Sequence, residues 1–166
     1  MVREQGNTVG SQTQVDLAYI AGFLDGDGSL MIQLKRRSES KLGTRRVMLT
    51  ICFYQDSRHD EPLHWIRNIL GIGYIYRRND GMTELRVNGH KRVLDILENL
   101  LPFLRFKKKQ AQAIISSAQL LLAAGCDIAP IKEQLIDNIL IVQSENYATK
   151  KKRSKQELKS IFGLTP

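Results

Sequence analysis

Two stretches of the chain alternate between apolar and polar residues, which is the pattern of strands with one buried face. Residues 30–35 carry aliphatic side chains at even positions, and residues 46–54 carry apolar side chains at odd positions. Shorter alternating runs at 74–78 and 84–88 flank Asn79-Asp80-Gly81, which is a tight-turn sequence. These patterns predict two antiparallel hairpins, each with one apolar and one polar face.

Helical spacing of apolar residues separates and follows the hairpins. Residues 15–24 precede the first hairpin, residues 62–70 lie between the hairpins, and residues 93–101 follow the second. Two further helices are expected at 107–124 and 130–143, with a short helical segment near the end. The order αββαββα plus C-terminal helices predicts an α+β fold, with one four-stranded antiparallel sheet whose apolar face is covered by helices.

The length of 166 residues and the apolar content of 42% are typical of one globular domain. We expect a flexible arm at 1–13, one domain at 14–145, and a basic tail with a short helix at 146–166. The chain has no apolar run of about 18 residues, and its polar start lacks the apolar core of a signal peptide. Its two cysteines are too few for a disulfide framework or a zinc site. The sequence therefore favours an intracellular protein with no membrane partner.

The polar face of the predicted sheet is basic. The chain has 25 Lys and Arg against 17 Asp and Glu, a net charge of +8, which favours polyanionic partners. Amides, cations and aromatic side chains on one face can contact phosphates and base edges, so we expect DNA or RNA binding; a solvated polar face is the alternative. The residues concerned are Gln33, Lys35, Arg37, Arg46, Tyr76, Arg78 and Arg86.

An acidic turn, Asp25-Gly26-Asp27-Gly28, follows the first predicted helix. The helix dipole disfavours carboxylates at this end, and a divalent cation would offset that cost. A plain helix-stop turn is the alternative. A calcium loop is excluded, because Leu30 and Arg36 occupy the positions that need Gly and Glu.

The segment from Ile20 to Gly28 closely resembles the LAGLIDADG motif, the signature of the LAGLIDADG homing endonucleases. The Gly71–Tyr74 turn and the Leu101–Ala111 stretch are also similar to the single-motif, homodimeric, group I intron-encoded branch, so the resemblance covers about residues 15–145. It implies the LAGLIDADG fold, whose saddle-shaped sheet binds a long, near-palindromic DNA target. The implied activity is a staggered double-strand break with short 3′ overhangs, which promotes intron mobility. An intron maturase that binds RNA and a non-catalytic DNA-binding regulator are the alternative functions.

The resemblance also implies a site. Asp27 and the Gly26 carbonyl match the metal-binding positions, and Gln55 and Lys107 match catalytic groups around them. The implied cofactor is Mg²⁺, with Mn²⁺ as a substitute and Ca²⁺ supporting binding without cleavage. A further basic role is left open between Arg58 and His59. Arg78 and Glu84 are expected to form a supporting ion pair.

One motif per chain implies a homodimer, since two motif helices are needed for a complete site. The matching interface positions are Ala18, Ala21, Gly22 and Asp25. The family pattern adds Met48 and Cys52 to the DNA-contacting face, and phosphate contacts are expected from Lys108, Lys109, Lys150, Lys151, Lys152 and Arg153; a solubilising tail is the alternative for the last four. The implied partners are double-stranded DNA, a second copy and, for a maturase, intron RNA. A chloroplast, a mitochondrion or a microbial cytoplasm is the expected location.

Overall fold

The computed structural model describes residues 13–36, 45–147 and 151–164. The predicted order of elements is confirmed, with single 3₁₀ turns at Ser57–His59 and Ala129–Ile131. The helices and strands are α1 (Gln14–Asp27), β1 (Gly28–Arg36), β2 (Arg45–Asp56), α2 (Glu61–Leu70), β3 (Tyr74–Arg77), β4 (Met82–Asn88), α3 (His90–Leu100), α4 (Lys108–Ala124), α5 (Lys132–Glu145) and α6 (Lys155–Ile161). The strand β4 begins two residues before the predicted run.

The start and end of α1 follow from local chemistry. Thr13 forms a capping box with Asp16, so the helix begins where the polar N-terminal segment ends. At the other end β1 begins at Gly28, directly after the helix. A Cβ atom on Gly28 would lie 2.7 Å from the Leu24 carbonyl oxygen, which only glycine avoids. The expected flexible arm falls almost entirely on residues outside the described part.

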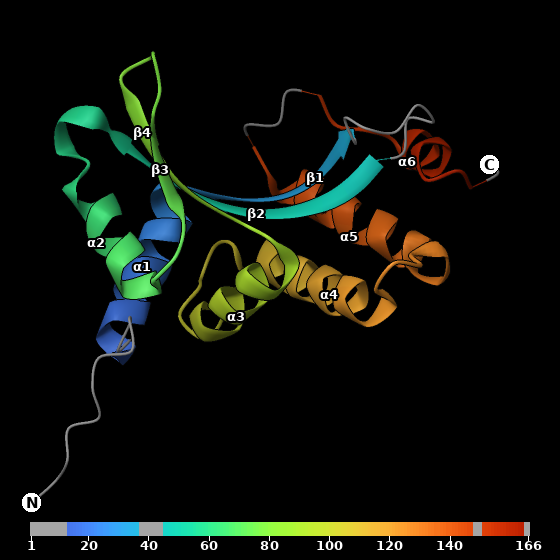
Figure 1. Cartoon of the computed structure of the whole chain (residues 1–166), viewed down its shortest axis with the longest axis horizontal. Coiled ribbons are helices and arrows are strands. Elements are labelled where there is room, and N and C mark those ends of the chain that lie inside the picture. The colour runs from blue at the N-terminus through green and yellow to red at the C-terminus, as the bar shows by residue number, and fades with distance from the viewer. Residues whose placement is uncertain (1–12, 37–44, 148–150, 165–166) are drawn as a thin grey trace, which may run out of the picture.

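The four strands form one antiparallel sheet in the order β1-β2-β4-β3. Its apolar face is built from aligned aliphatic pairs, such as Ile32 with Leu49 and Ile51 with Val87. Figure 1 shows the long β1–β2 ribbon curving above α3 and α4, which lie on one side of it. The opposite face carries the polar positions, so the predicted division between a core face and a polar face is confirmed.

The C-terminal helices belong to the same hydrophobic core as the sheet. Leu135 and Ile136 of α5 are fully buried, as is Leu158 of α6. The expected tail therefore contains a packed helix, Lys155–Ile161. No helix within the described residues is long and apolar enough to cross a membrane.

Candidate functional site

A pocket of about 720 Å³ lies where α1 ends. Its wall includes Asp25, Gly26 and Asp27 from the α1 terminus, together with Lys107 and Gln110 near the start of α4. The structure thus brings together three sequence-predicted residues, Gly26, Asp27 and Lys107. The start of β1, the end of β2, the β3–β4 turn and the end of α5 complete the wall.

The Asp25 carboxylate is occupied within its own chain. It accepts hydrogen bonds from the backbone N–H groups of Arg105 at 2.6 Å, Phe106 at 3.2 Å and Lys107 at 2.9 Å. These bonds fasten the α3–α4 connection to the end of α1. Asp25 therefore has a structural role in this chain. Its carboxylate, which was predicted to lie at a dimer interface, binds backbone N–H groups of its own chain instead.

Asp27, in contrast, is exposed and accepts no hydrogen bond from any residue that the structure describes. Its free carboxylate and the neighbouring Gly26 carbonyl are hard oxygen donors, which suit Mg²⁺. In the described residues, no three His, Cys, Asp or Glu side chains lie together as a metal-binding group. One chain therefore offers a partial donor set that fits a divalent cation but does not enclose it.

Lys107 is half-buried beside these acids. Its ammonium donates to the Asp25 carbonyl at 2.5 Å. Burial lowers the pKa of Lys107, and the nearby charges of Asp25 and Asp27 offset this only in part. The geometry thus directs a desolvated cation into the pocket beside Asp27, as the sequence predicts.

Gln55 does not line this pocket, and its Oε1 accepts a hydrogen bond from the Asp56 N–H at 2.8 Å. Its catalytic role stays a prediction. The neighbouring Tyr54 lines the pocket instead, and its hydroxyl lies 3.1 Å from the Ser29 hydroxyl. Arg58 forms an ion pair with Asp56 at 2.8 Å, whereas His59 is exposed.

The polar face of the sheet has the predicted register. Gln33 lies opposite Met48, and Lys35 lies opposite Arg46, with Lys35 and Arg46 exposed. Two like charges directly opposite each other destabilise a strand pair unless an anion lies over them. Phosphates would supply that anion.

Cys52 is a correction to the predicted DNA-contacting set. It is fully buried, lies opposite Arg86 on β4, and burial raises the pKa of its thiol. Arg86 forms a 2.7 Å ion pair with the buried Glu84. Arg86 is more exposed than Cys52. Of this cross-strand pair, the arginine is therefore the residue that could donate hydrogen bonds to DNA.

The expected ion pair between Arg78 and Glu84 is also wrong. Arg78 pairs with Asp80 at 2.6 Å, because both residues lie in the β3–β4 turn, while Glu84 is taken by Arg86. Arg78 lines the pocket of Asp27. Tyr76, on β3, lies opposite Glu84 and is half-exposed.

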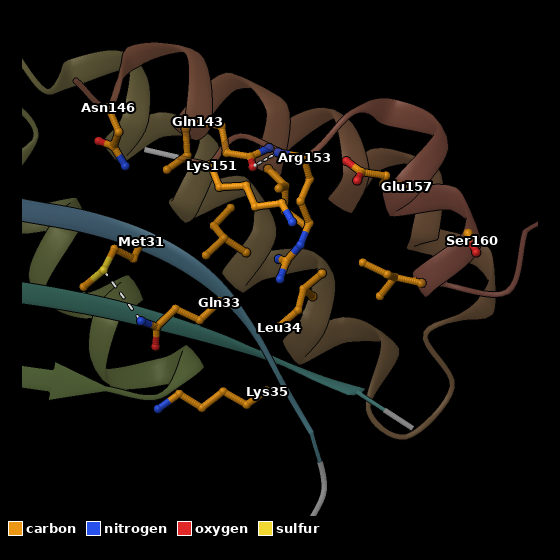
Figure 2. A pocket seen from close by; sticks show the side chains of 14 residues that line it. Met31, Gln33, Leu34, Lys35, Gln143, Asn146, Lys151, Arg153, Glu157 and Ser160 are labelled. Atoms are coloured by element: carbon orange, nitrogen blue, oxygen red, sulfur yellow. Dashed lines mark hydrogen bonds between the residues drawn. The ribbon is translucent and has the colours of Figure 1, made fainter. Parts of the chain in front are cut away.

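A second cavity, of about 760 Å³, is lined by residues of β1, α5 and α6 and by Lys151 and Arg153. Figure 2 shows Lys151 and Arg153 extending from the C-terminal segment toward β1, where Gln33 and Lys35 also line the cavity. Lys151 and Arg153 therefore line the same cavity as the polar side chains of the edge strand β1. Lys108, Lys109 and Lys152 are exposed, with Lys109 lying 3.4 Å from Glu145. Arg37 and Lys150 lie outside the described residues.

The exposed side of α1 differs from the predicted interface at one position. Ala18 and Gly22 are exposed, as are Val15 and Tyr19, whereas Ala21 is fully buried in the core of its own chain. Ala21 is one residue after Ile20 and three before Leu24, so it shares their inward face. It is therefore removed from the predicted interface.

Several pocket residues were not predicted as site residues. Gln110, Asn146 and Tyr147 come from α4 and from the end of α5, and tertiary packing brings them to Asp27. The Asn146 amide donates to the Leu30 carbonyl at 3.1 Å, which holds the end of α5 against β1. Two signals were available: the alternation of β2 places Tyr54 on the polar face, and Gln110 lies in the Leu101–Ala111 stretch that resembles the family.

Comparison with known proteins agrees with this fold. A family model described as LAGLIDADG endonuclease matches residues 20–115. DNA endonuclease I-CvuI of Chlorella vulgaris is 40% identical over 103 residues, which are 61% of this chain and 63% of that protein. DNA endonuclease I-CreI of Chlamydomonas reinhardtii is 31% identical over 99 residues, or 60% of each chain. These matches span about three fifths of each relative's length.

The similarity extends to three dimensions. A crystal structure of the homing endonuclease I-CvuI with the I-CreI target matches with a TM-score of 0.75 and 27% identity, covering 90% of this chain and 94% of that one. An archaeal intron-encoded homing endonuclease, I-Vdi141I, has the same fold, with a TM-score of 0.74 and 21% identity. The α+β architecture, a four-stranded antiparallel sheet with helices, is the one found in LAGLIDADG homing endonuclease structures. The chain belongs to the LAGLIDADG endonuclease family.

Proposed function

We propose that this chain is a site-specific, metal-dependent DNA endonuclease of the homing type. It makes a staggered double-strand break with short 3′ overhangs in a long, near-palindromic target and so promotes intron mobility. The observation that carries the proposal is the free carboxylate of Asp27 beside the desolvated Lys107, at the end of a basic sheet face. The relatives named DNA endonucleases support it.

Hydrolysis requires a bond between a water oxygen and phosphorus while the bond to the leaving ester oxygen breaks and that oxygen takes up a proton. A bound Mg²⁺ would lower the pKa of a ligand water and stabilise the charge that develops on the phosphate. Asp27 and the Gly26 carbonyl would hold the ion. Lys107 would place its ammonium against the same phosphate, where low exposure to water strengthens the attraction.

A homodimer would complete the site. Gly22 and Gly26 lie in α1, where glycine lowers helix stability, yet an added Cβ would meet no atom of the described residues within 4 Å beyond the adjoining helix backbone. The reason for glycine at these positions therefore lies outside the chain, and close approach of a second α1 supplies one. Such packing would bring two copies of Asp27 together around shared cations. A sedimentation experiment with the intact chain tests this, since a dimer has twice the mass of 18.9 kDa.

Double-stranded DNA is the proposed substrate, with one half-site on each sheet. The side chains proposed to face the groove are Gln33, Lys35, Arg46, Met48, Tyr76, Arg78 and Arg86. Lys108, Lys109, Lys151, Lys152 and Arg153 would hold phosphates, and such contacts add affinity without sequence information. An organelle or a microbial cytoplasm is the proposed setting.

The decisive experiment is cleavage of the uninterrupted sequence that flanks the gene's own intron, with the I-CreI target as a second substrate. Wild type is compared with Asp27→Asn, and Asp95→Asn on the exposed side of α3 is the control. Cutting by wild type and the control, but not by Asp27→Asn, supports the proposal. Tight DNA binding without cutting by any of them would indicate a regulator, and tighter binding of intron RNA would indicate a maturase.

The metal requirement is tested in the same assay. Mg²⁺ and Mn²⁺ should support cutting, and Ca²⁺ should support binding alone. Cutting by wild type in EDTA would contradict the proposed role of Asp27, because its carboxylate would then hold no ion that the reaction needs.

A further inference from the structure

Gln110 is a buried amide in the wall of the proposed catalytic pocket. It lies in the first turn of α4 and lines the pocket together with Asp27 and Lys107. Its side chain is only 4% exposed. Glutamine is seldom buried to this degree unless its polar atoms have partners.

The two ends of the Gln110 amide differ in their contacts. Nε2 donates to the Glu145 carbonyl at 3.4 Å, whereas Oε1 has no hydrogen-bond partner in the described part of the chain. The reverse orientation of the amide would bring two carbonyl oxygens together, so Glu145 fixes Oε1 as the free acceptor. A buried acceptor without a donor costs free energy, which indicates a donor outside the residues that the structure describes.

A role in packing alone does not account for this side chain. Its neighbours Ala111, Ala113 and Ile114 show that apolar residues fill the interior face of α4. The bond to Glu145 uses only the N–H end of the amide and is at the long limit for a hydrogen bond. Gln110 also lines the pocket of Asp27, which is wide enough for several water molecules.

We propose that Gln110 is a positioning residue for DNA cleavage, whose Oε1 accepts a hydrogen bond from a water molecule in the pocket of Asp27 and Lys107. This water orders the solvent beside the phosphate and so restricts where the attacking water can lie. The inference rests on the proposed endonuclease function. It adds to that function a neutral hydrogen-bond acceptor, Gln110 Oε1, which binds water and does not contact the DNA.

The test uses the full chain with the DNA target that wild type cuts. Gln110→Met removes both polar atoms at nearly constant volume, and Gln112→Met changes an exposed glutamine of the same helix. We expect Gln110→Met to bind DNA in Ca²⁺ as wild type does and to cleave in Mg²⁺ roughly 10- to 100-fold more slowly, the usual range for a supporting polar partner. Gln112→Met should cleave at close to the wild-type rate.

Two results would overturn the inference. Wild-type cleavage by Gln110→Met would show that the acceptor is not needed. A loss of folding stability or of DNA binding in Ca²⁺ by Gln110→Met as large as its loss of cleavage would assign the effect to the bond with Glu145, which is a structural role. A crystal structure of the full chain with DNA and Ca²⁺ gives a readout that needs no cleavage: a water on Oε1 supports the inference, and a protein donor there overturns it. If wild type cuts no target, the endonuclease proposal fails, and this structure still decides the place of the water.

Discussion

Lys107 donates two hydrogen bonds to Asp25, one from its backbone and one from its side chain. The Lys107 N–H donates to the Asp25 carboxylate at 2.9 Å, and the Lys107 ammonium donates to the Asp25 carbonyl at 2.5 Å. The end of α1 and the start of α4 are thereby fixed together, although 82 residues separate them in sequence. The relationship places a cation beside Asp27 without using the Asp27 carboxylate, so one acid of the motif positions the site and the other remains free for chemistry.

This division predicts opposite results for two similar substitutions. Asp25→Asn replaces an acceptor of three N–H groups by an amide that can repel them, so we expect a loss of roughly 1–3 kcal/mol in the free energy of unfolding. Asp27→Asn disturbs no described bond and should change the free energy of unfolding by less than about 0.5 kcal/mol. Urea unfolding measures both effects. Equal stability of the two variants would contradict the structural role of Asp25.

Lys107 should make stability depend on pH. Because its pKa is lowered in the folded chain, the unfolded chain binds more protons between that pKa and the ordinary value near 10.4. Stability contributed at Lys107 therefore rises with pH across this window and is lowest at neutral pH. Lys107→Met lacks the titration, so the difference in unfolding free energy between wild type and variant should change between pH 7 and pH 10.5. Urea titrations of both proteins at several pH values measure it.

The same substitution should separate stability from activity. Loss of one charged group that stabilises the transition state slows reactions roughly 100- to 1,000-fold, so Lys107→Met should cut DNA at least that much more slowly while remaining folded. Lys107→Arg restores the charge but not its position, so a partial recovery is expected. Cleavage by Lys107→Met at the wild-type rate would remove Lys107 from the reaction.

The sequence predicted the sheet well because alternation reports directly which face is buried. Leu49 and Ile51 occupy core positions for that reason, and Lys35 and Arg46 occupy the exposed face. Alternation correctly placed Cys52 on the polar face but could not reveal that it is buried there. Its cross-strand neighbour Arg86 forms an ion pair with Glu84, and alternation does not report such side-chain pairing. Helical spacing did indicate that Ala21 lies on the inward face with Ile20 and Leu24, and the family resemblance placed it in the interface instead.

The site was predicted where short sequence motifs carry it. Gly26, Asp27 and the turn that presents them lie in nine consecutive residues, and Lys107 lies in the Leu101–Ala111 stretch that resembles the family. Asn146 reaches the pocket through the packing of α5, which depends on many weak contacts spread over the chain. Such a residue leaves no short-range signal.

Lys35 and Arg46 should show their DNA contacts through salt dependence. If each binds a phosphate in both copies of a dimer, Lys35→Ala should reduce the slope of log affinity against log salt by about 2. It should also leave folding stability unchanged or slightly higher, because a like charge opposite Arg46 is removed. Lys91→Ala on α3 changes net charge equally and serves as the control. The measurement is DNA affinity in Ca²⁺ over a range of salt concentrations. Equal slopes of log affinity against log salt for Lys35→Ala and Lys91→Ala would contradict a phosphate contact at Lys35.

Substitutions of Gly22 in α1 and of Gly28 directly after it should affect folding and dimerisation differently. Gly22→Ala meets no atom of its own chain and gains helix propensity, so the isolated fold should be stabilised by about 1 kcal/mol. The added methyl groups would instead lie between two packed helices, so the dissociation constant of the dimer should rise. Gly28→Ala is the contrasting variant, because its Cβ would lie 2.5–2.8 Å from atoms of Leu24 and should destabilise the fold by about 1–3 kcal/mol. Sedimentation across protein concentrations, with urea unfolding in parallel, distinguishes the two effects. A Gly22→Ala variant that dimerises as tightly as wild type would mean that α1 does not form the interface, and the second Asp27 would then have to reach the site by another route.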